Sequence, residues 1–479
     1  RHPRFAIGES STPLTNLLLE ELATEHGIPE LATFAKWGSW RRHHPEIGVG
    51  LKRGFTFYHH IPGSPWSRRA DQANELLVAA SPNDEVADTH WYRPEFDAYW
   101  ADHALRSGVE SLDETEVTEF AETPEGLRLH GQRRGENVSV RARFLVDASG
   151  PRGFLFRHLG WKEARFPGFP EMEALFAHFR GVERWDSLEH PGPVPSSSLP
   201  YPPDDAALHH VFPGGWMWVL RFDHGVTSAG VSVHPDLARE LNLRDGAPAW
   251  QRLMDRLPSV GRQFRTAQAV TPFVHSPCLS FRSPQVAGNR WALLPSAAGF
   301  LDPLLSTGFP LTLLGVQRLA RLFRPGTFPE PSALANYAAE TRQDLEHVAE
   351  LVGALLSTLH RPAVFEALSL LYFAAASFAE SARRLDRSQF APGFLLRDHP
   401  QFRHALRDLA AAAREPSTDP VEFRQRVETA IEPFDVIGLR QPNRRPWYPV
   451  DPDTLYRNRH KLEVDPEAIT SMLRRCGMR

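Results

Sequence analysis

The chain has 479 residues, more than one ordinary hydrophobic core holds, so two or three packed units are expected. Its 42% hydrophobic and 23% charged residues are typical of soluble globular proteins. A net charge of −4 excludes the basic excess by which proteins bind nucleic acid, so we expect no nucleic-acid partner.

Targeting and redox signals are few. Cys278 and Cys476 are the only cysteines, which excludes a disulfide framework or a cysteine-based zinc site and favours a cytoplasmic location. The chain opens on "RHPRF", with no initiator methionine and no signal peptide, so we expect its beginning to have been cut away. Residues 364–379 are the most apolar stretch, shorter than the ~20 residues of a membrane span, and predict a buried helix.

Local patterns predict the elements of the first half in chain order. A helix begins at Pro13, after a Ser/Thr cap, and ends at Gly27. Residues 52–60 alternate as a strand does, and residues 94–106 form a second helix. Five further segments predict a hairpin that feeds a strand, and then one antiparallel sheet: residues 126–134, 136–150, 171–180, 209–222 and 227–235.

The second half is predicted to become helical. Residues 190–203 contain six prolines and predict a long loop, either a plain connector or a lid over a site. Residues 309–323 form a helix with leucines on one face, and the chain from Pro331 onwards reads as a helical region. The expected architecture is therefore α/β elements, an inserted antiparallel sheet and a helical C-terminal third.

The stretch "RFLVDASGPRG" suggests a ligand-binding turn. The apolar run that ends in Val146 precedes Asp147 and the small residues of the turn that contains Gly150. Ligands of open α/β sheets bind beyond the carboxyl ends of strands, where glycine lets the backbone approach closely. The alternative is an ordinary strand-end turn capped by Asp147.

The stretch "GFLDPLLSTGFPL", residues 299–311, follows an apolar strand-like run and precedes a helix. Small residues before a helix leave free N–H groups at the positive end of its dipole, which favours an anion. Asp302 can accept a hydrogen bond from a ribityl-like hydroxyl or cap the turn locally. The alternative is a Ser/Thr cap on a core helix.

Together with "AIGESSTPL" and "WYRPEFDAYW", these two stretches resemble the flavin-dependent halogenases, which share the aromatic-hydroxylase fold. The resemblance covers roughly residues 1–325. It implies a Rossmann-like FAD-binding domain, an inserted antiparallel sheet and a helical C-terminal region. The implied division is 1–165 for the FAD-binding domain with part of the substrate sheet, 166–275 for the substrate sheet, 276–330 for the second flavin segment and 331–479 for the helical domain.

The resemblance also implies a reaction and its residues. Reduced FAD from a separate flavin reductase would react with oxygen and chloride or bromide, and Lys52 would relay the halogenating species to an electron-rich aromatic substrate. The implied flavin-contacting residues are Gly8, Glu9, Ser10, Ser11, Thr12, Pro13, Arg93, Asp147, Ser149, Gly150, Ser296, Gly299, Asp302 and Pro303. The implied halide-binding residues are Ser306, Thr307 and Gly308.

Four departures from the family pattern qualify this interpretation. The "GxGxxG" fingerprint is absent and would lie before Arg1. Pro295-Ser296 stands where the family has Gly-Asp, and Arg221 replaces the proline of the string "WMWVLR". Leu305 replaces the glutamate that tryptophan halogenases carry, so free tryptophan is not the expected substrate.

Two other functions stay open: flavin-dependent hydroxylation on the same fold, which the altered "WMWVLR" favours, and a binding protein whose cofactor site has decayed. Paired histidines such as His59-His60 do not predict a metal site, because adjacent strand residues point to opposite faces. The tryptophans near the predicted strands could line an aromatic pocket or fill the core. The sequence does not indicate an oligomeric state.

Overall fold

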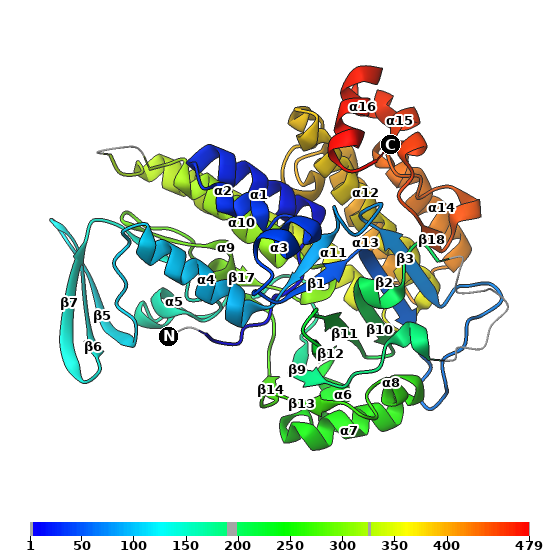
Figure 1. The fold of residues 1–479 in the computed structure, drawn as a ribbon, viewed down its shortest axis with the longest axis horizontal. Helices are drawn as coiled ribbons and strands as arrows, with labels where there is room; N and C mark the ends of the chain where they lie inside the picture. The colour runs from blue at the N-terminus through cyan, green and yellow to red at the C-terminus, as the bar shows by residue number, and fades with distance from the viewer. Residues whose placement is uncertain (1–2, 189–198, 324–326, 479) are drawn as a thin grey trace. The chain divides into compact units, whose positions relative to one another are not determined.

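The structure, a computed structural model, describes residues 3–188, 199–323 and 327–478 (Figure 1). The chain forms two compact units, and each is assembled from three stretches of sequence. Unit 1 contains Arg1–Glu9, Trp91–Pro167 and Ser280–Ala349, and unit 2 contains Ser10–His90, Gly168–Leu279 and Glu350–Arg479.

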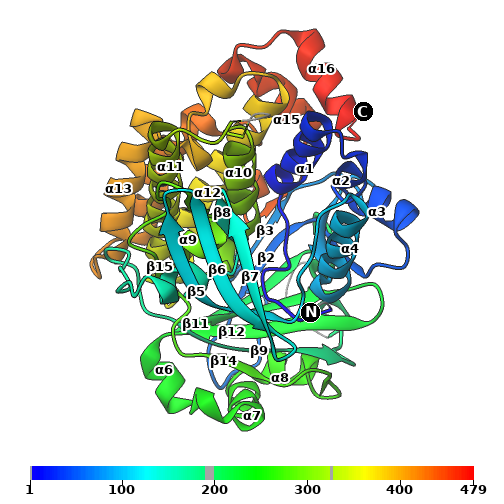
Figure 2. The same cartoon turned by 90° about the vertical axis from the view of Figure 1, so that its left-hand side faces the viewer.

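Unit 1 contains a three-stranded antiparallel sheet, drawn in cyan in Figure 2. Leu127 and Leu129 of its middle strand are buried while the residues between and after them are more exposed, as the two-residue period of a strand requires. The predicted hairpin is therefore confirmed. The strands are β5 (Thr115–Thr123), β6 (Gly126–Arg133) and β7 (Glu136–Ala142).

Unit 1 also contains a parallel pair of strands, β8 (Leu145–Asp147) and β16 (Trp291–Leu293). Asp147 lies opposite Leu293, and the N–H of Leu294 donates to the carbonyl oxygen of Asp147 at 2.9 Å. Because parallel strands end at the same edge, the chain segments that follow β8 and β16 begin side by side. The other elements of the unit are α4 (Arg93–Arg106), α5 (Phe154–His158), β15 (Phe281–Arg282), α9 (Pro295–Ala298), β17 (Gly299–Phe300) and α10 (Gly308–Ala320).

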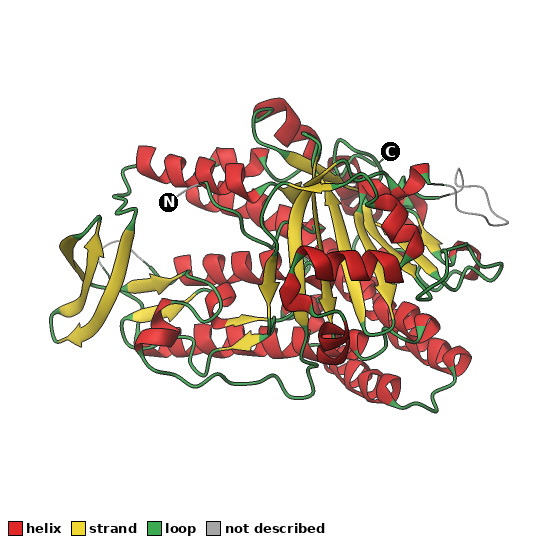
Figure 3. Ribbon diagram, turned by 90° about the horizontal axis from the view of Figure 1, so that it is seen from below, coloured by secondary structure: helices red, strands yellow, loops and turns green. Residues whose placement is uncertain are grey.

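Unit 2 is built around a nine-stranded sheet, whose strands are among those drawn in yellow in Figure 3. The strand order is β13-β9-β12-β11-β10-β2-β3-β18, and β14 also pairs with β9. The strands are β2 (Gly54–His59), β3 (Glu75–Ala79), β9 (Glu173–Arg180), β10 (Ala207–Phe212), β11 (Gly215–Arg221), β12 (Val226–Val233), β13 (Gln268–Ala269), β14 (Val274–Ser276) and β18 (Trp447–Tyr448).

The predicted antiparallel sheet is confirmed in β9–β12. The complete sheet is mixed, because β2 pairs in parallel with β10 and β18 pairs in parallel with β3. Residues 10–90 belong to unit 2, where β2 and β3 join this sheet; the expected 1–165 domain was to contain part of the substrate sheet. The parallel pairings join strands that are far apart in the sequence, for which local patterns carry no signal.

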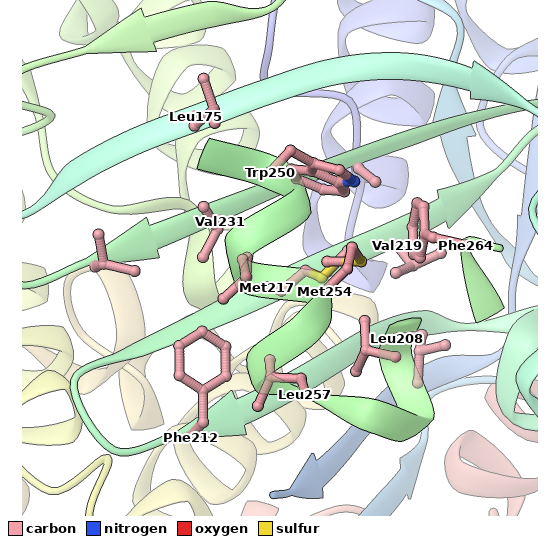
Figure 4. Close-up of a cluster of buried hydrophobic side chains, with 14 of the residues drawn as sticks. Leu175, Leu208, Phe212, Met217, Val219, Val231, Trp250, Met254, Leu257 and Phe264 are labelled. Atoms are coloured by element: carbon pink, nitrogen blue, oxygen red, sulfur yellow. The ribbon is translucent and has the colours of Figure 1, made fainter. Parts of the chain in front are cut away.

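One face of the sheet is covered by α7 (Ala247–Arg256), as Figure 4 shows. Trp250 and Met254 are one helical turn apart on the same face of α7, and both pack on the sheet. The strand residues beneath them are buried aliphatic and aromatic side chains. The residues labelled on the sheet are Leu175, Leu208, Phe212, Met217, Val219 and Val231.

The other face packs against α12 (Pro362–Arg384), which contains the predicted buried helix. Phe57 of β2 lies edge-on to Phe365, with ring centroids 5.6 Å apart, and Phe55 contacts Tyr372 and Phe373 in the same way. Among the described residues, α12 alone has the length and composition of a membrane span. In this structure 72% of its most apolar window is buried within the protein.

The remaining elements are mostly short helices, and the predicted helices beginning at Pro13, near Pro94 and near Phe309 are confirmed as α1, α4 and α10. α11 (Pro331–Leu356) begins in unit 1 and ends in unit 2. Most of the proline-rich segment 190–203 lies outside the described residues. The other elements of unit 2 are α1 (Pro13–His26), α2 (Pro29–Thr33), α3 (Trp37–His43), β1 (Val49–Lys52), β4 (Asp88–Trp91, whose last residue is the first of the unit 1 stretch), α6 (Pro235–Glu240), α8 (Pro258–Gln263), α13 (Pro400–Arg414), α14 (Pro420–Ile431), α15 (Pro452–Arg457) and α16 (Pro466–Arg475).

Candidate functional site

In unit 1, Arg93 holds the N-terminal segment of the chain. Its Nη1 donates to the carbonyl oxygen of Gly8 at 3.0 Å, while Nε and Nη2 donate to the two carboxylate oxygens of Asp97 at 2.7 and 2.8 Å. Gly8 has φ of +87°, a conformation that favours glycine. Glu9 follows, and its carbonyl oxygen accepts from the N–H of Trp91 at 2.7 Å. The segment is thus fixed by backbone and guanidinium contacts.

The start of α10 lies beside this segment. Phe309 stacks on Trp91, with ring centroids 4.0 Å apart and an interplanar angle of 27°, and the Arg93 guanidinium lies 5.6 Å from the Phe309 ring centroid. Both residues flank the arginine that binds Gly8. Unit 1 therefore brings together three sequence-predicted positions, Gly8, Arg93 and Gly308, from distant parts of the chain.

The predicted halide segment forms the N-terminus of α10. Ser306 has φ of +53°, a strained conformation for a residue with a side chain. Thr307 occupies the N-cap position, but its side chain makes no capping hydrogen bond, contrary to the alternative that it is an ordinary cap. Gly308 begins the helix, and a Cβ added to it would meet no atom within 4 Å.

The "DASG" turn is held together by its own side chains. Asp147 Oδ1 accepts from the N–H and the hydroxyl of Ser149 at 2.8 and 2.5 Å, and Oδ2 accepts from the N–H of Leu155 at 2.8 Å. Ser149 Oγ in turn accepts from the N–H of Phe154 at 2.6 Å. These side chains shape the turn. A ligand can approach the backbone at Gly150, which has φ of +83° and open space where a Cβ would stand.

The segment after β16 lies next to that turn, because β8 and β16 are parallel neighbours. Half-buried Ser296 lies in α9, whereas a Cβ on Gly299 would come within 2.7 Å of Leu345 Cδ1, which makes Gly299 a packing residue. Asp302 Oδ1 accepts from the N–H of Leu304 at 3.0 Å across the turn that begins at Pro303, so the local-cap alternative holds for that oxygen.

In unit 2, the four predicted residues from Ser10 to Pro13, at the start of α1, make mainly structural contacts. Ser11 binds β4 twice, since its N–H donates to the carbonyl oxygen of Thr89 at 3.0 Å and its Oγ accepts from the N–H of Thr89 at 3.0 Å. Thr12 caps α1 through a reciprocal pair of contacts with Thr15, and Pro13 is the first helical residue. Ser10 Oγ is buried without a hydrogen-bond partner among the described residues.

Lys52 ends β1 and is completely buried within unit 2. Its Nζ donates to the carbonyl oxygen of Ser11 at 2.5 Å and lies 3.9 Å from the centroid of the Phe55 ring. Burial lowers the pKa of Lys52 from 10.5 to about 7, against the attraction of Asp88. The alternative of a solvated lysine at a strand end is therefore wrong for this structure.

Four polar residues around Lys52 and Asp88 were missed by sequence reasoning. Asp88 lies on β4, which pairs with β1, and burial raises its pKa to about 7 despite the attraction of Lys52. Burial likewise lowers the pKa values of His90 and His209 to about 3, so both rings are neutral. Asn16 could have been noticed, because it is a polar residue among the leucines of α1. No feature of the string "ADTHW" distinguishes Asp88 from an ordinary surface aspartate.

The paired histidines point to opposite faces of the sheet, as expected. His59 contacts Phe365 of α12, whereas His60 Nε2 lies 3.0 Å from His210 Nδ1 on the opposite face. The part of the chain described here contains no group of three metal-ligating side chains. Trp216 and Trp218 are buried in β11, which favours their role as core residues.

Taken separately, the two units offer different chemistry. Unit 1 offers open, preorganised backbone at Gly150 and Gly308, where a planar ring, a phosphate or a small anion can approach. That open backbone fits a flavin, although the side chains of Asp147 and Ser149 are engaged within the protein. Unit 2 offers an amine, Lys52, that is poised to be neutral near physiological pH.

Comparison with known proteins identifies the family of this chain. Residues 87–362 match the family model described as tryptophan halogenase. The chain is 30% identical over 325 residues to the monodechloroaminopyrrolnitrin halogenase PrnC of Pseudomonas fluorescens, and 31% identical over 318 residues to the tetracycline 7-halogenase of Kitasatospora aureofaciens. These alignments cover 67% and 65% of this chain and 55% of each relative, so the chain spans about half the length of the curated relatives it matches.

The fold is also that of a solved halogenase. The crystal structure of halogenase PltM in complex with phloroglucinol and FAD superposes with a TM-score of 0.81 at 21% sequence identity, covering 94% of this chain and 93% of the other. At this identity the likeness establishes the fold alone. The predicted architecture, a Rossmann-type FAD fold with an inserted sheet and a helical C-terminal region, is confirmed.

Proposed function

Because the chain belongs to the tryptophan halogenase family, we propose that it carries out flavin-dependent halogenation of a small, electron-rich aromatic substrate. The observation that carries the proposal is the environment of Lys52, a fully buried amine whose charged form is disfavoured. A buried lysine without a catalytic or ligand-binding role is uncommon, because burying its charge costs several kcal/mol. We assign Lys52 the role of relaying the halogenating species.

The flavin-binding part of this proposal is unit 1. Gly8, Arg93, Gly150 and the segment from Ser296 to Pro303 would hold FAD. Within that segment Gly299 packs against Leu345, while Asp147 and Ser149 maintain the turn after β8. When bound and reduced, FAD supplies, with oxygen and halide, a hypohalous acid. The open position at Gly308, the strained Ser306 and the non-capping hydroxyl of Thr307 support these three residues as the halide site.

The substrate-binding part is the sheet of unit 2 and the helices that cover it. An electrophilic halogen needs an electron-rich ring, and Leu305 in place of the acid of the tryptophan halogenases argues against free tryptophan. The reduced flavin would come from a separate reductase. Neither Cys278 nor Cys476 is in a disulfide, which supports the expected cytoplasmic location.

The test supplies the protein with FAD, a flavin reductase, NADH, oxygen and bromide, with a panel of indoles, phenols and pyrroles. We expect a product with the bromine isotope doublet by mass spectrometry. Lys52→Met keeps the apolar packing of the buried stem and should abolish that product. The matched control, Lys36→Met, removes a partly exposed lysine that pairs with Glu20 and should retain it.

Two results would redirect the proposal. A product heavier by one oxygen, formed equally without bromide, would indicate the hydroxylase alternative, which the presence of Arg221 favours. In this structure Arg221 is anchored by Asp204 at 2.6 Å and by the Val182 carbonyl oxygen at 2.9 Å. Full-length protein, with its N-terminal segment restored, that is colourless and fails to bind FAD in equilibrium dialysis would indicate the decayed-site alternative.

A further inference from the structure

The side of the unit 2 sheet that faces α12 contains a row of aromatic rings that begins at Lys52. The amine lies 3.9 Å from the centroid of the Phe55 ring, and Phe55 stacks on His209 with ring centroids 5.9 Å apart and an interplanar angle of 9°. His209 also stacks on Phe57, 4.5 Å away, and contacts the ring of Trp216, 5.4 Å away. The row therefore leads from the amine, across β2 and β10, to an indole on β11.

His209 is fixed as a neutral ring with one acceptor atom. Its Nδ1 lies 3.0 Å from the carbonyl oxygen of Thr56, and because a carbonyl oxygen only accepts, Nδ1 carries the hydrogen. Burial lowers the pKa of His209 to about 3, against the carbonyl oxygens of Thr56 and Ala207, so the ring gains no second proton near neutral pH. Nε2 therefore presents a lone pair, to which no group within the described ranges donates a hydrogen bond.

Trp216 presents the complementary group, a donor. Its side chain is 1% exposed, and its indole Nε1–H is buried without a hydrogen-bond partner among the residues that the structure describes. Trp218, two residues along the same strand, is also buried, but its Nε1–H donates to Ser228 Oγ at 3.3 Å. Buried polar groups nearly always have a partner, so a donor and an acceptor on two contacting rings indicate a ligand group that bridges them.

The bridging group must both accept and donate. It has to accept from the indole N–H of Trp216 and donate to Nε2 of His209, and a hydroxyl does both with a single oxygen. An ether or carbonyl oxygen only accepts, and a pyrrole or indole N–H only donates. Water meets the same requirement, but the neighbouring surfaces are the rings of Phe55, Phe57 and Trp218, which suit a hydroxyl that is carried by an aromatic ring.

We infer that Trp216 and His209 bind a phenolic hydroxyl and thereby make a phenol the preferred aromatic substrate. The role of this phenol as the molecule to be halogenated rests on the proposed function, whereas its binding needs neither flavin nor halide. A hydroxyl that donates to His209 increases the electron density of its own ring at the ortho and para carbons. Those are the carbons that an electrophilic halogen attacks, so the pair both selects the substrate and favours its reaction.

The experiment compares three ligands of similar size. 4-Ethylphenol donates and accepts, 4-ethylanisole only accepts, and 4-ethyltoluene does neither. Labelling tryptophan with 15N at the indole nitrogen gives 12 NMR signals, and the signal that disappears in Trp216→Phe belongs to Trp216. 4-Ethylphenol should move that signal downfield, because the N–H gains an acceptor, and should bind about tenfold more tightly than 4-ethyltoluene.

Two substitutions separate the two halves of the site, and each retains an aromatic ring. His209→Phe removes the acceptor, so the affinity for 4-ethylphenol should fall to that for 4-ethylanisole. Trp216→Phe removes the donor, so the affinities for both oxygen-containing ligands should fall by about three- to tenfold, while that for 4-ethyltoluene stays the same. The control Trp218→Phe removes an indole N–H that already has a partner in Ser228 and should leave all three affinities unchanged.

Three results would overturn the inference. One is 4-ethylphenol that binds no more tightly than 4-ethyltoluene or shows no saturable binding. Another is a Trp216 signal that stays in place at saturation, because a water molecule would then hold the donor instead. The third is a loss of affinity in Trp216→Phe that is equal for all three ligands, which indicates altered packing. Far-UV circular dichroism checks the fold of each variant, and Trp216→Phe alone decides the question if His209→Phe does not fold. Bound 4-ethylphenol that is not halogenated would count against the proposed function and not against this site.

Discussion

Glu366 is a carboxylate buried inside α12, and its removal tests how the helical region of unit 2 is held to the sheet. Its Oε1 accepts from Arg424 Nη1 at 2.9 Å and from Arg445 Nε at 3.1 Å, and its Oε2 accepts from Arg445 Nη2 at 3.0 Å. Arg424 also donates to the hydroxyl of Tyr448 in β18 at 3.0 Å. One carboxylate thus joins α12 to α14 and to the segment that contains the edge strand.

The expected cost of Glu366→Gln follows from burial. The side chains of Glu366 and Arg424 are 2% and 10% exposed, so the variant leaves a guanidinium in the interior with only the partly exposed Glu428 as a counter-ion. Removal of one partner of a buried pair costs about 3–5 kcal/mol. Arg445 is 35% exposed and can be rehydrated, which places the expected loss near the lower end, about 3 kcal/mol.

The control uses the same arginine. Glu428 accepts from Arg424 Nε at 2.8 Å but is 31% exposed, so Glu428→Gln should cost less than about 1 kcal/mol. Urea unfolding of the two variants, followed by far-UV circular dichroism, measures the difference. Equal losses in the two variants, or a loss below 1 kcal/mol for Glu366→Gln, would refute the claim that burial decides the value of this ion pair.

Three further predictions concern one histidine and two glycines. Burial lowers the pKa of His59 to about 3, below its ordinary value of 6.5, so between these values the unfolded chain binds a proton that the native state does not. The unfolding free energy should therefore fall as pH drops below 6.5, and His59→Phe should remove up to about 1.4 kcal/mol per pH unit of that slope in urea titrations at pH 4–7. Gly308→Ala should stabilise α10 by up to about 1 kcal/mol in thermal melts, because no atom meets the new Cβ. In the bromination assay the same variant should need a higher bromide concentration. An unchanged dependence on bromide would argue against the halide site. Gly315→Ala would place a Cβ 2.2 Å from Pro295 Cγ, so it should lower the melting temperature of unit 1 and displace α9, read out as weaker FAD binding.

The sequence predicted individual helices and strands well, because caps and hydrophobic periodicity depend on neighbouring residues. The cap at Thr12, Pro13 and Gly27 delimit α1, and the alternation in residues 54–59 corresponds to β2. The sequence did not predict that β2 would pair in parallel with β10, because that contact joins segments about 150 residues apart with no shared local signal.

The candidate site likewise contains residues that the sequence identified and residues that only the fold reveals. Resemblance to a family identified Lys52, but its burial follows from packing beneath Phe55 and from the contacts of the segment at Ser11. Asp88 could not be inferred, because an aspartate at the start of a strand is usually a solvated end or a cap. Its electrostatic influence on Lys52 arises only when β1 and β4 pair, which is again a contact between distant segments.

The pairing of β18 with β3 has a consequence for how the protein is made. Trp447 lies opposite Leu77, so the outer edge of β3 stays uncovered during synthesis until the ribosome has reached Trp447, far along the chain from Leu77. An uncovered edge invites pairing with other chains, and contacts between such distant segments form slowly. Nascent chains of this protein should therefore depend on chaperones that shield strand edges, and substitutions at Trp447 should reduce the yield of folded protein more than its final stability.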